Sequence, residues 1–220
     1  MRNRILICAI AAAALVALVP MASAASFPDP PKPSATPAAG TATAVLAGGC
    51  YWGMQGIYEH MKGVTSTVVG YAGGAAATAK YDIVSEGDTG HAESIKITYD
   101  PSKITYGDIL KVYFSAAHDP TTLNRQHYDV GTQYRSSIFY SDDEQKNVAE
   151  AYIRDLNAAH VFKDQIVTKV VPLKGFYPAE GYHQHFLDHN PNQGYIAAVD
   201  IPLLKGFQEK YPELYTKESK

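Results

Sequence analysis

Apolar and polar positions alternate along several short stretches of the chain, which is typical of β-strands that bury one face. These predicted strands lie at 45–47, 65–71, 94–99, 136–140 and 166–171. Apolar positions at helical spacing predict helices at 51–61, 105–114 and 179–189, and the capping box at 141–144 begins another that runs to about His160. The order β-α-β-β-α-β-α-β predicts an α+β fold, a two-layer α/β sandwich with a mixed sheet near the ferredoxin-like plan.

The N-terminus departs from this pattern and predicts an export signal. Two arginines precede an apolar run at 5–19, which is shorter than the roughly 20 residues of a membrane span. Small residues at 22–24 suit a cleavage site, so 1–24 is predicted to be a secretory signal peptide of an exported, periplasmic or secreted, protein. A Pro/Ala-rich linker is expected at 25–43, the folded domain at 44–204 and a C-terminal tail at 205–220.

The charge of the chain argues against two classes of partner. The 220 residues include 19 Lys and Arg and 22 Asp and Glu, and loss of the signal with its two arginines leaves 17 against 22, a net charge of −5. Because no basic run is present, we expect no nucleic-acid partner and no membrane partner after signal cleavage. One domain of this size can bury its own core, and we expect a monomer.

The cysteine count singles out Cys50. The chain has two cysteines, and Cys8 falls inside the expected signal. Exported proteins commonly pair their cysteines, so a solitary one indicates a free thiol or an intermolecular bond. Cys50 follows Gly48-Gly49 at the start of a predicted helix, where the helix dipole and free N–H groups favour a thiolate. It is either a small hydrophobe in an aromatic core or a nucleophile, and the glycines favour the nucleophile because they let a substrate approach closely.

The surroundings of Cys50 resemble a known family. Residues 49–53, Gly-Cys-Tyr-Trp-Gly, are similar to the G-C-F-W-G signature of the A-type peptide methionine sulfoxide reductases. Further blocks agree with that family in order and spacing, at 70–74, 81–93, 118–120, 131–136 and 182–184. Residues 44–204 are thereby identified as a member of this family, which implies thiol-dependent reduction of peptidyl, and free, methionine S-sulfoxide in oxidised proteins to methionine.

Sulfoxide reduction sets the needs of the site. A sulfoxide sulfur is a poor electrophile until its oxygen is protonated or hydrogen-bonded, so a nucleophile, a proton donor and an apolar wall for the methyl group must meet. The resemblance implies Cys50 as the nucleophile and Glu93 as the acid, held protonated by a pKa that burial raises. It implies Tyr81 and Tyr134 as hydrogen-bond donors to the oxygen.

The resemblance also implies substrate-binding residues. Tyr51 and Trp52 would form the methyl pocket, and because the family usually has Phe at the position of Tyr51, we expect the added hydroxyl at the pocket rim. Asp129 would orient the substrate backbone. The residues alone leave Glu93 compatible with a surface carboxylate and Asp129 with an ordinary loop aspartate. The family uses no metal, and no cofactor is expected.

Recycling of Cys50 is expected to need an external thiol. Many family members carry resolving cysteines near the C-terminus, often after a Gly-Tyr pair, whereas here Ile196 follows Gly194-Tyr195 and no later residue is a cysteine. The resemblance therefore implies a sulfenic acid on Cys50 that no internal thiol can condense with. A thioredoxin-like domain, a glutaredoxin-like protein or a small thiol are the candidate reductants.

One rival interpretation is a different thiol enzyme. A Cys–His–Glu acyl transferase or hydrolase would pair Cys50 with His91 or His118. His91 lies two residues from Glu93, so both would point to one face of a strand, and we interpret His91 as structural or orienting.

A second rival is a histidine-rich metal-binding module at 183–189. His185 and His189 are one helical turn apart, with His183 nearby. No Cys or acidic ligand motif accompanies them, so a polar helix face is the favoured interpretation and no metal is expected.

Overall fold

The computed structural model describes residues 27–31 and 40–220. The expected signal peptide and most of the expected linker lie outside the described residues. In the described part of the chain, no helix has the length and apolar character needed to cross a membrane.

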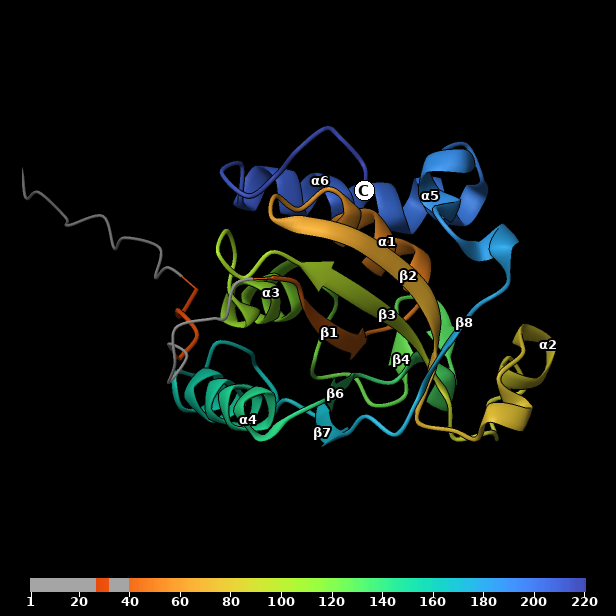
Figure 1. The fold of residues 1–220 in the computed structure, drawn as a ribbon, viewed down its shortest axis with the longest axis horizontal. Helices are drawn as coiled ribbons and strands as arrows, with labels where there is room; N and C mark the ends of the chain where they lie inside the picture. The colour runs from red at the N-terminus through yellow and green to blue at the C-terminus, as the bar shows by residue number, and fades with distance from the viewer. Residues whose placement is uncertain (1–26, 32–39) are drawn as a thin grey trace, which may run out of the picture.

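A mixed sheet forms one layer of the fold (Figure 1). Its strands are β1 (Ala42–Ala47), β2 (Val64–Ala72), β3 (Ala92–Tyr99), β6 (Ser137–Tyr140), β7 (Lys169–Pro172) and β8 (Phe176–Pro178), in the order β7-β6-β1-β3-β2-β8. Only β6 and β7 pair in parallel. The central order β6-β1-β3-β2, with helices after β1 and β3, confirms the predicted ferredoxin-like arrangement. A separate two-stranded ribbon joins β4 (Arg125–Gln126) to β5 (Asp129–Val130).

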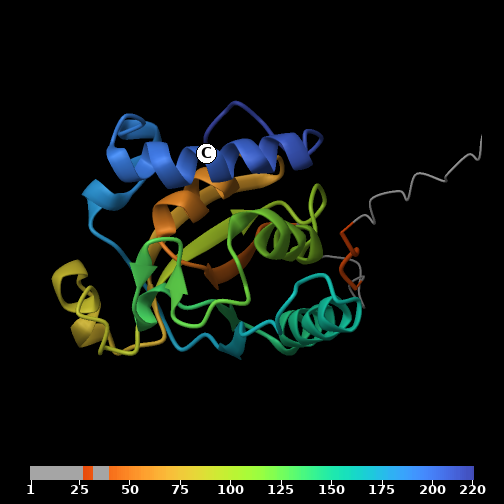
Figure 2. The same ribbon diagram turned by 180° about the vertical axis from the view of Figure 1, so that it is seen from behind.

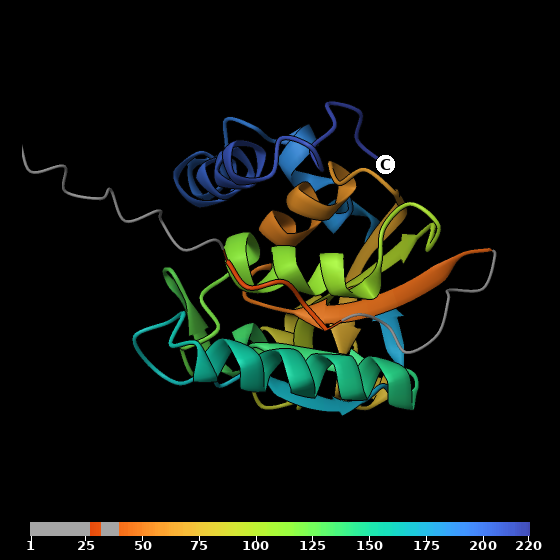
Figure 3. The ribbon, with the colours of Figure 1, turned by 90° about the vertical axis from the view of Figure 1, so that its left-hand side faces the viewer.

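Most of the helices form the second layer. The α-helices of the described residues are α1 (Tyr51–Glu59), α2 (Tyr81–Val84), α3 (Tyr106–Val112), α4 (Asp143–Ala158), α5 (Phe186–His189) and α6 (Ile201–Lys210). Short 3₁₀ turns occur at η1 (Ala76–Thr78), η3 (Thr132–Tyr134) and η4 (Gly181–His183), and π-helical turns at η2 (Tyr113–Ala117) and η5 (Ile196–Asp200). Figure 3 shows α3 and α4 side by side in front of the strands, with α6 beside α1 above them. Figure 2 shows that α2 lies at the edge of the molecule, away from this layer.

The alternation along β1 explains where the core lies. Ala44 and Leu46 point into the main apolar cluster, which the helices cover, whereas Val45 and Ala47 pack with Phe139 on the opposite face. In the sheet β1 lies between β6 and β3, and as a central strand it buries apolar side chains on both faces. The chain leaves this central strand directly into α1, which places residue 50 at the edge of the core.

Two predicted helices differ from those observed. The N-cap of α4 is Asp142, whose carboxylate accepts the Gln145 N–H at 2.8 Å. The Gln145 side chain in turn accepts the Ser141 N–H. The capping residues are therefore Asp142 and Gln145, one residue later than the pair predicted at 141 and 144. The single helix predicted at 179–189 is wrong, because His185 has a φ of 53°, a left-handed conformation that a right-handed helix cannot continue.

The C-terminal residues belong to the domain, so the predicted boundary after residue 204 is wrong: it falls inside α6. Phe207 is fully buried in the main core, and α6 packs along α1. Leu203, Phe207 and Tyr211 recur every four residues, a helical signal that the sequence carries.

The expected linker is also partly packed. Residues 27–31 have no regular structure, yet Phe27 meets the Phe162 ring edge-on at 6.2 Å and the Pro28 carbonyl accepts the Tyr152 hydroxyl at 2.7 Å. Asp29 pairs with Lys111 at 2.6 Å.

Candidate active site

The turn from β1 into α1 places Cys50 at the N-cap of α1, half-buried. Gly49 has a φ of 98°, and a Cβ atom there would lie 2.7 Å from Cβ of Gln126. A Cβ atom on Gly48 would lie 2.9 Å from the His118 ring. Both glycines are thus required by the close packing of the turn, and they leave the sulfur next to the first N–H groups of α1.

Glu93 lies on β3 beside the start of α1. Its Oε2 accepts the Tyr51 backbone N–H at 3.2 Å, and the residue is only 4% exposed. Burial raises the pKa of Glu93 to about 8, the negative charge of Asp129 adds to this rise, and the Tyr51 N–H opposes it. The predicted rise is present, so the carboxyl is largely protonated at neutral pH and able to donate a proton next to Cys50.

The thiol of Cys50 behaves differently from the sequence-based expectation. Burial raises its pKa well above the ordinary value, and the nearby charges of Glu93 and Asp200 raise it further. The Trp52 backbone N–H at the helix start lowers it, but this contribution is smaller. The helix N-terminus favours the thiolate of Cys50 as predicted, but burial and the neighbouring charges outweigh this contribution.

Tyr81 and Tyr134 come from two different loops and reach the same site. Tyr81 begins α2 and Tyr134 ends η3. Burial and the charges of Glu93 and Cys50 raise the pKa of both hydroxyls, so both are neutral hydrogen-bond donors. Glu180 positions Tyr81 by accepting its backbone N–H at 3.0 Å.

An aromatic cluster lies beside the sulfur. Tyr51 is 1% exposed, so the expectation that its hydroxyl lies at a pocket rim is wrong. In this buried position the hydroxyl interacts with the side chain of Tyr71. Trp52 stacks on Phe186 with ring centroids 3.9 Å apart. The ring of His183 lies against the rings of Tyr51 and Trp52, and neither of its nitrogens is hydrogen-bonded to a described residue. Burial lowers the pKa of His183, so its ring is neutral.

The C-terminal segment supplies two residues that the sequence interpretation missed. The Tyr195 hydroxyl donates to Asp129, which begins β5, and so holds this half-buried carboxylate beside the site. Asp200 is 1% exposed with Oδ2 unpartnered among the described residues, and a Cβ on Gly53 would lie 2.5 Å from its Oδ1. Both lie some 150 residues from Cys50, and only the packing of η5 against α1 brings them close.

The two histidines considered as bases are already engaged. His91 accepts the Gly74 N–H at Nδ1, 3.2 Å, and lies 2.9 Å from the Ala75 carbonyl through Nε2. His118 bonds the Tyr113 carbonyl and the Ser136 hydroxyl, and burial lowers its pKa to about 4. Both ring nitrogens of each histidine are hydrogen-bonded within the fold, so neither histidine is free to act as the general base that a Cys–His hydrolase needs.

Comparison with known proteins settles the family. The family model for peptide methionine sulfoxide reductase matches residues 42–215. The chain belongs to this family. The reductase is 52% identical over 181 residues to the peptide methionine sulfoxide reductase MsrA 2 of Mesorhizobium japonicum, covering 82% of this chain and 93% of the relative. It is 47% identical over 195 residues to MsrA 2 of Synechocystis, covering 87% and 91%.

Solved structures agree with the fold of the reductase. Reduced Mxr1 from Saccharomyces cerevisiae superposes with a TM-score of 0.63 at 36% identity, covering 70% of this chain and 88% of that one. Methionine sulfoxide reductase A of Corynebacterium diphtheriae gives 0.59 at 36% identity, covering 69% and 76%. The protein is an enzyme that reduces peptidyl methionine sulfoxide and is recycled by thiols.

Replacing Asp200 with Asn is expected to make Cys50 more reactive in the reductase. The substitution removes a negative charge that raises the pKa of the Cys50 thiol. Because burial raises the pKa of Asp200 to about 7, this charge is fully present only above pH 7, so the thiolate fraction should increase most when it is measured above that value. Alkylation of Cys50 by iodoacetamide should accelerate about three- to tenfold. The exposed Asp164→Asn variant is the matched control, and an unchanged rate in a folded Asp200→Asn protein would contradict the prediction.

Proposed function

We propose that Cys50 attacks the sulfur of a methionine S-sulfoxide while Glu93 protonates the departing oxygen. The observation that carries this proposal is the contact of Glu93 with the Tyr51 N–H, which holds a buried protonated carboxyl at the residue next to the nucleophile. A neutral acid and a sulfur at one helix N-terminus are what sulfoxide chemistry requires.

The electron and proton balance of the proposed first half-reaction closes on these two residues. As the Cys50 sulfur bonds to the sulfoxide sulfur, Glu93 gives its proton to the sulfoxide oxygen and takes the proton of the thiol in return. The S–O bond of the substrate then breaks and the hydroxyl moves to the Cys50 sulfur, while the new S–S bond breaks and methionine leaves with its electron pair, so that Cys50 is left as a sulfenic acid.

The neighbouring side chains are proposed to bind the substrate. Tyr81 and Tyr134 carry neutral hydroxyls that donate to the sulfoxide oxygen. Trp52, supported by Phe186, offers an apolar face to the methyl group, and the buried Tyr51 forms the back of that wall. Asp129, held by Tyr195, accepts from the substrate backbone.

The proposed second half-reaction uses an external thiol. Its sulfur attacks the Cys50 sulfenic acid, a mixed disulfide forms and water leaves; a second thiol then releases Cys50 and a disulfide product. The absence of any cysteine after Cys50 in the sequence supports this route, and a thioredoxin-like protein is the proposed donor. The signal-like residues 1–24 support a proposal that the reductase and its thioredoxin-like donor act outside the cytoplasm.

A single-turnover experiment tests the proposed chemistry. Reduced enzyme is mixed with one equivalent of an S-sulfoxide peptide without reductant, and Cys50 is examined by mass spectrometry after trapping with dimedone. We expect one dimedone adduct on Cys50 and one equivalent of methionine peptide, with the R-sulfoxide peptide as the unreactive control. An acyl adduct on Cys50, or equal reaction of both epimers, would contradict the proposal.

A further inference from the structure

A second group of side chains lies at the far end of α1, roughly 13 Å along the helix from Cys50. Glu59, His60 and Asp188 each offer one ligand atom, and these atoms all lie within 4.8 Å of one another. We propose that these three residues bind a divalent metal ion of the zinc class. This departs from the sequence-based expectation that the protein uses no metal, and it concerns none of the residues assigned to sulfoxide reduction.

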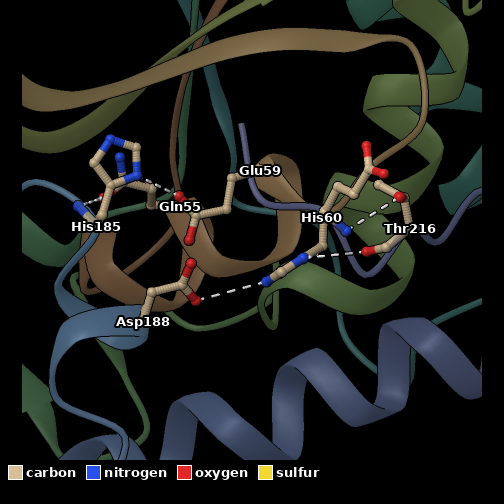
Figure 4. Close-up of polar contacts among 7 residues, drawn as sticks. Gln55, Glu59, His60, His185, Asp188 and Thr216 are labelled. Carbon is tan, nitrogen blue, oxygen red and sulfur yellow. Dashed lines mark hydrogen bonds and ion pairs between the residues drawn. The ribbon is translucent and has the colours of Figure 1, made fainter.

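Glu59 provides the first reason. Its side chain is fully buried, and Oε2 pairs with His185 Nδ1 at 2.8 Å. Oε1 makes no hydrogen bond of good geometry with a described residue, although Ser219 lies close enough to interact with the carboxylate. Figure 4 shows the carboxylate of Glu59 directed toward that of Asp188. Two carboxylates facing each other repel unless a cation or a shared proton lies between them, and no Lys or Arg in the described part of the chain pairs with either.

His60 provides the second reason, because its tautomer is fixed. Nδ1 lies 3.1 Å from the Thr216 carbonyl, which can only accept, so Nδ1 carries the proton (Figure 4). In the neutral ring Nε2 then presents its lone pair to Asp188 Oδ1, 3.6 Å away. A metal-binding histidine usually donates its other N–H to a backbone carbonyl in this way.

The spacing of these atoms suits one shared ion. Two ligands that each lie about 2.1 Å from a tetrahedral zinc ion stand roughly 3.4 Å apart. The 3.6 Å separation of His60 Nε2 and Asp188 Oδ1 is too long for a hydrogen bond but close to this value. The Asp188 side chain is 33% exposed, which gives the ion a path from solvent and leaves the fourth position to water.

His185 is assigned an orienting role. Its left-handed backbone is held by a hydrogen bond that its N–H donates to Gln55 Oε1 at 2.6 Å, and its ring nitrogen Nδ1 holds Oε2 of Glu59 in place. The other Glu59 oxygen is thereby left for the ion. Metal binding would join the end of α1 to α5 and, through His60 and Thr216, to the C-terminal segment, so it should stabilise the fold.

Zinc binding to the Cys50→Ser protein tests the proposal, because that background removes the thiol, which can itself bind zinc. Equilibrium dialysis at micromolar zinc, with metal content measured by mass spectrometry, should find one ion per chain. The midpoint of thermal unfolding should rise by about 5 °C at a hundredfold excess of zinc over Kd. In this background His60→Gln and Asp188→Asn should each weaken binding at least about tenfold. The exposed position of Asp188 makes Asp188→Asn the variant whose folding is least at risk.

The matched control is His189→Gln in the same background. His189 lies on α5 with its ring 6.3 Å from that of His185, but it is not among the proposed ligands. We expect it to leave the stoichiometry and Kd unchanged. Loss of zinc in His189→Gln with retention in His60→Gln would place the ion on the α5 histidines and overturn the proposal. Absence of bound zinc in the folded Cys50→Ser protein would overturn it as well, and a proton shared by the two carboxylates would then explain their approach.

Discussion

Replacing Cys50 with Ser is expected to abolish turnover of a methionine sulfoxide peptide. A serine hydroxyl is a far weaker nucleophile than a thiol and cannot form a sulfenic acid, so both half-reactions fail. Turnover of dabsyl-methionine sulfoxide with dithiothreitol should fall by at least about a thousandfold, to the uncatalysed background.

The other cysteine of the chain provides the control for this prediction. In the full-length chain, which keeps the expected signal peptide, Cys8→Ser removes the other thiol, and we expect it to leave turnover unchanged. Circular dichroism and thermal unfolding should show that both variants keep the fold. Retained turnover in folded Cys50→Ser would disprove the assignment of the nucleophile.

Replacing Glu93 with Gln is expected to lower kcat by about 10²–10⁴-fold and to change its pH dependence. The pKa of Glu93 in the folded protein is about 8, so the proton-donating form is present below pH 8 and is lost as the pH rises through that value. Activity of the unmodified enzyme should therefore decline on this alkaline side. A glutamine side chain cannot titrate, so the Glu93→Gln variant should lack that decline when kcat is measured across a pH range that brackets 8.

The control for Glu93 is a carboxylate outside the site. Glu86 is exposed in the loop after α2, and Glu86→Gln should keep both the rate and the alkaline decline. If Glu93→Gln shows the same decline as the unmodified enzyme, another group gives rise to it and Glu93 is not the acid.

Much of the fold was predictable because local patterns agree with it. The alternating residues of β1, β2 and β3 and the helix after Cys50 carry strong periodic signals, and their order implies the central sheet. The errors lie where long-range contacts decide. His185 breaks a helix because its N–H bonds to Gln55, 130 residues away, and no local signal encodes that contact.

The motif predicts the members of the candidate site, but it does not predict their electrostatics. It indicates Cys50, Glu93, Tyr81 and Tyr134, and in the structure the charges of Glu93 and Cys50 act on the hydroxyls of both tyrosines. The helix N-terminus lowers the pKa of Cys50, as a local argument expects. Burial and the charges of Glu93 and Asp200 raise it by more, and the position of Asp200 depends on how the C-terminal segment packs.

The residue after Tyr195 has a kinetic consequence. Ile196 is fully buried at the start of η5, so a side chain at this position packs in the core. Under the proposed mechanism, the lifetime of the oxidised enzyme is set by collisions with a donor, and its repair rate follows donor concentration. During that lifetime the sulfenic acid is open to a second oxidant molecule, which would convert it irreversibly to a sulfinic acid. Under severe oxidation with little donor, a single overoxidation of Cys50 would therefore inactivate the enzyme permanently.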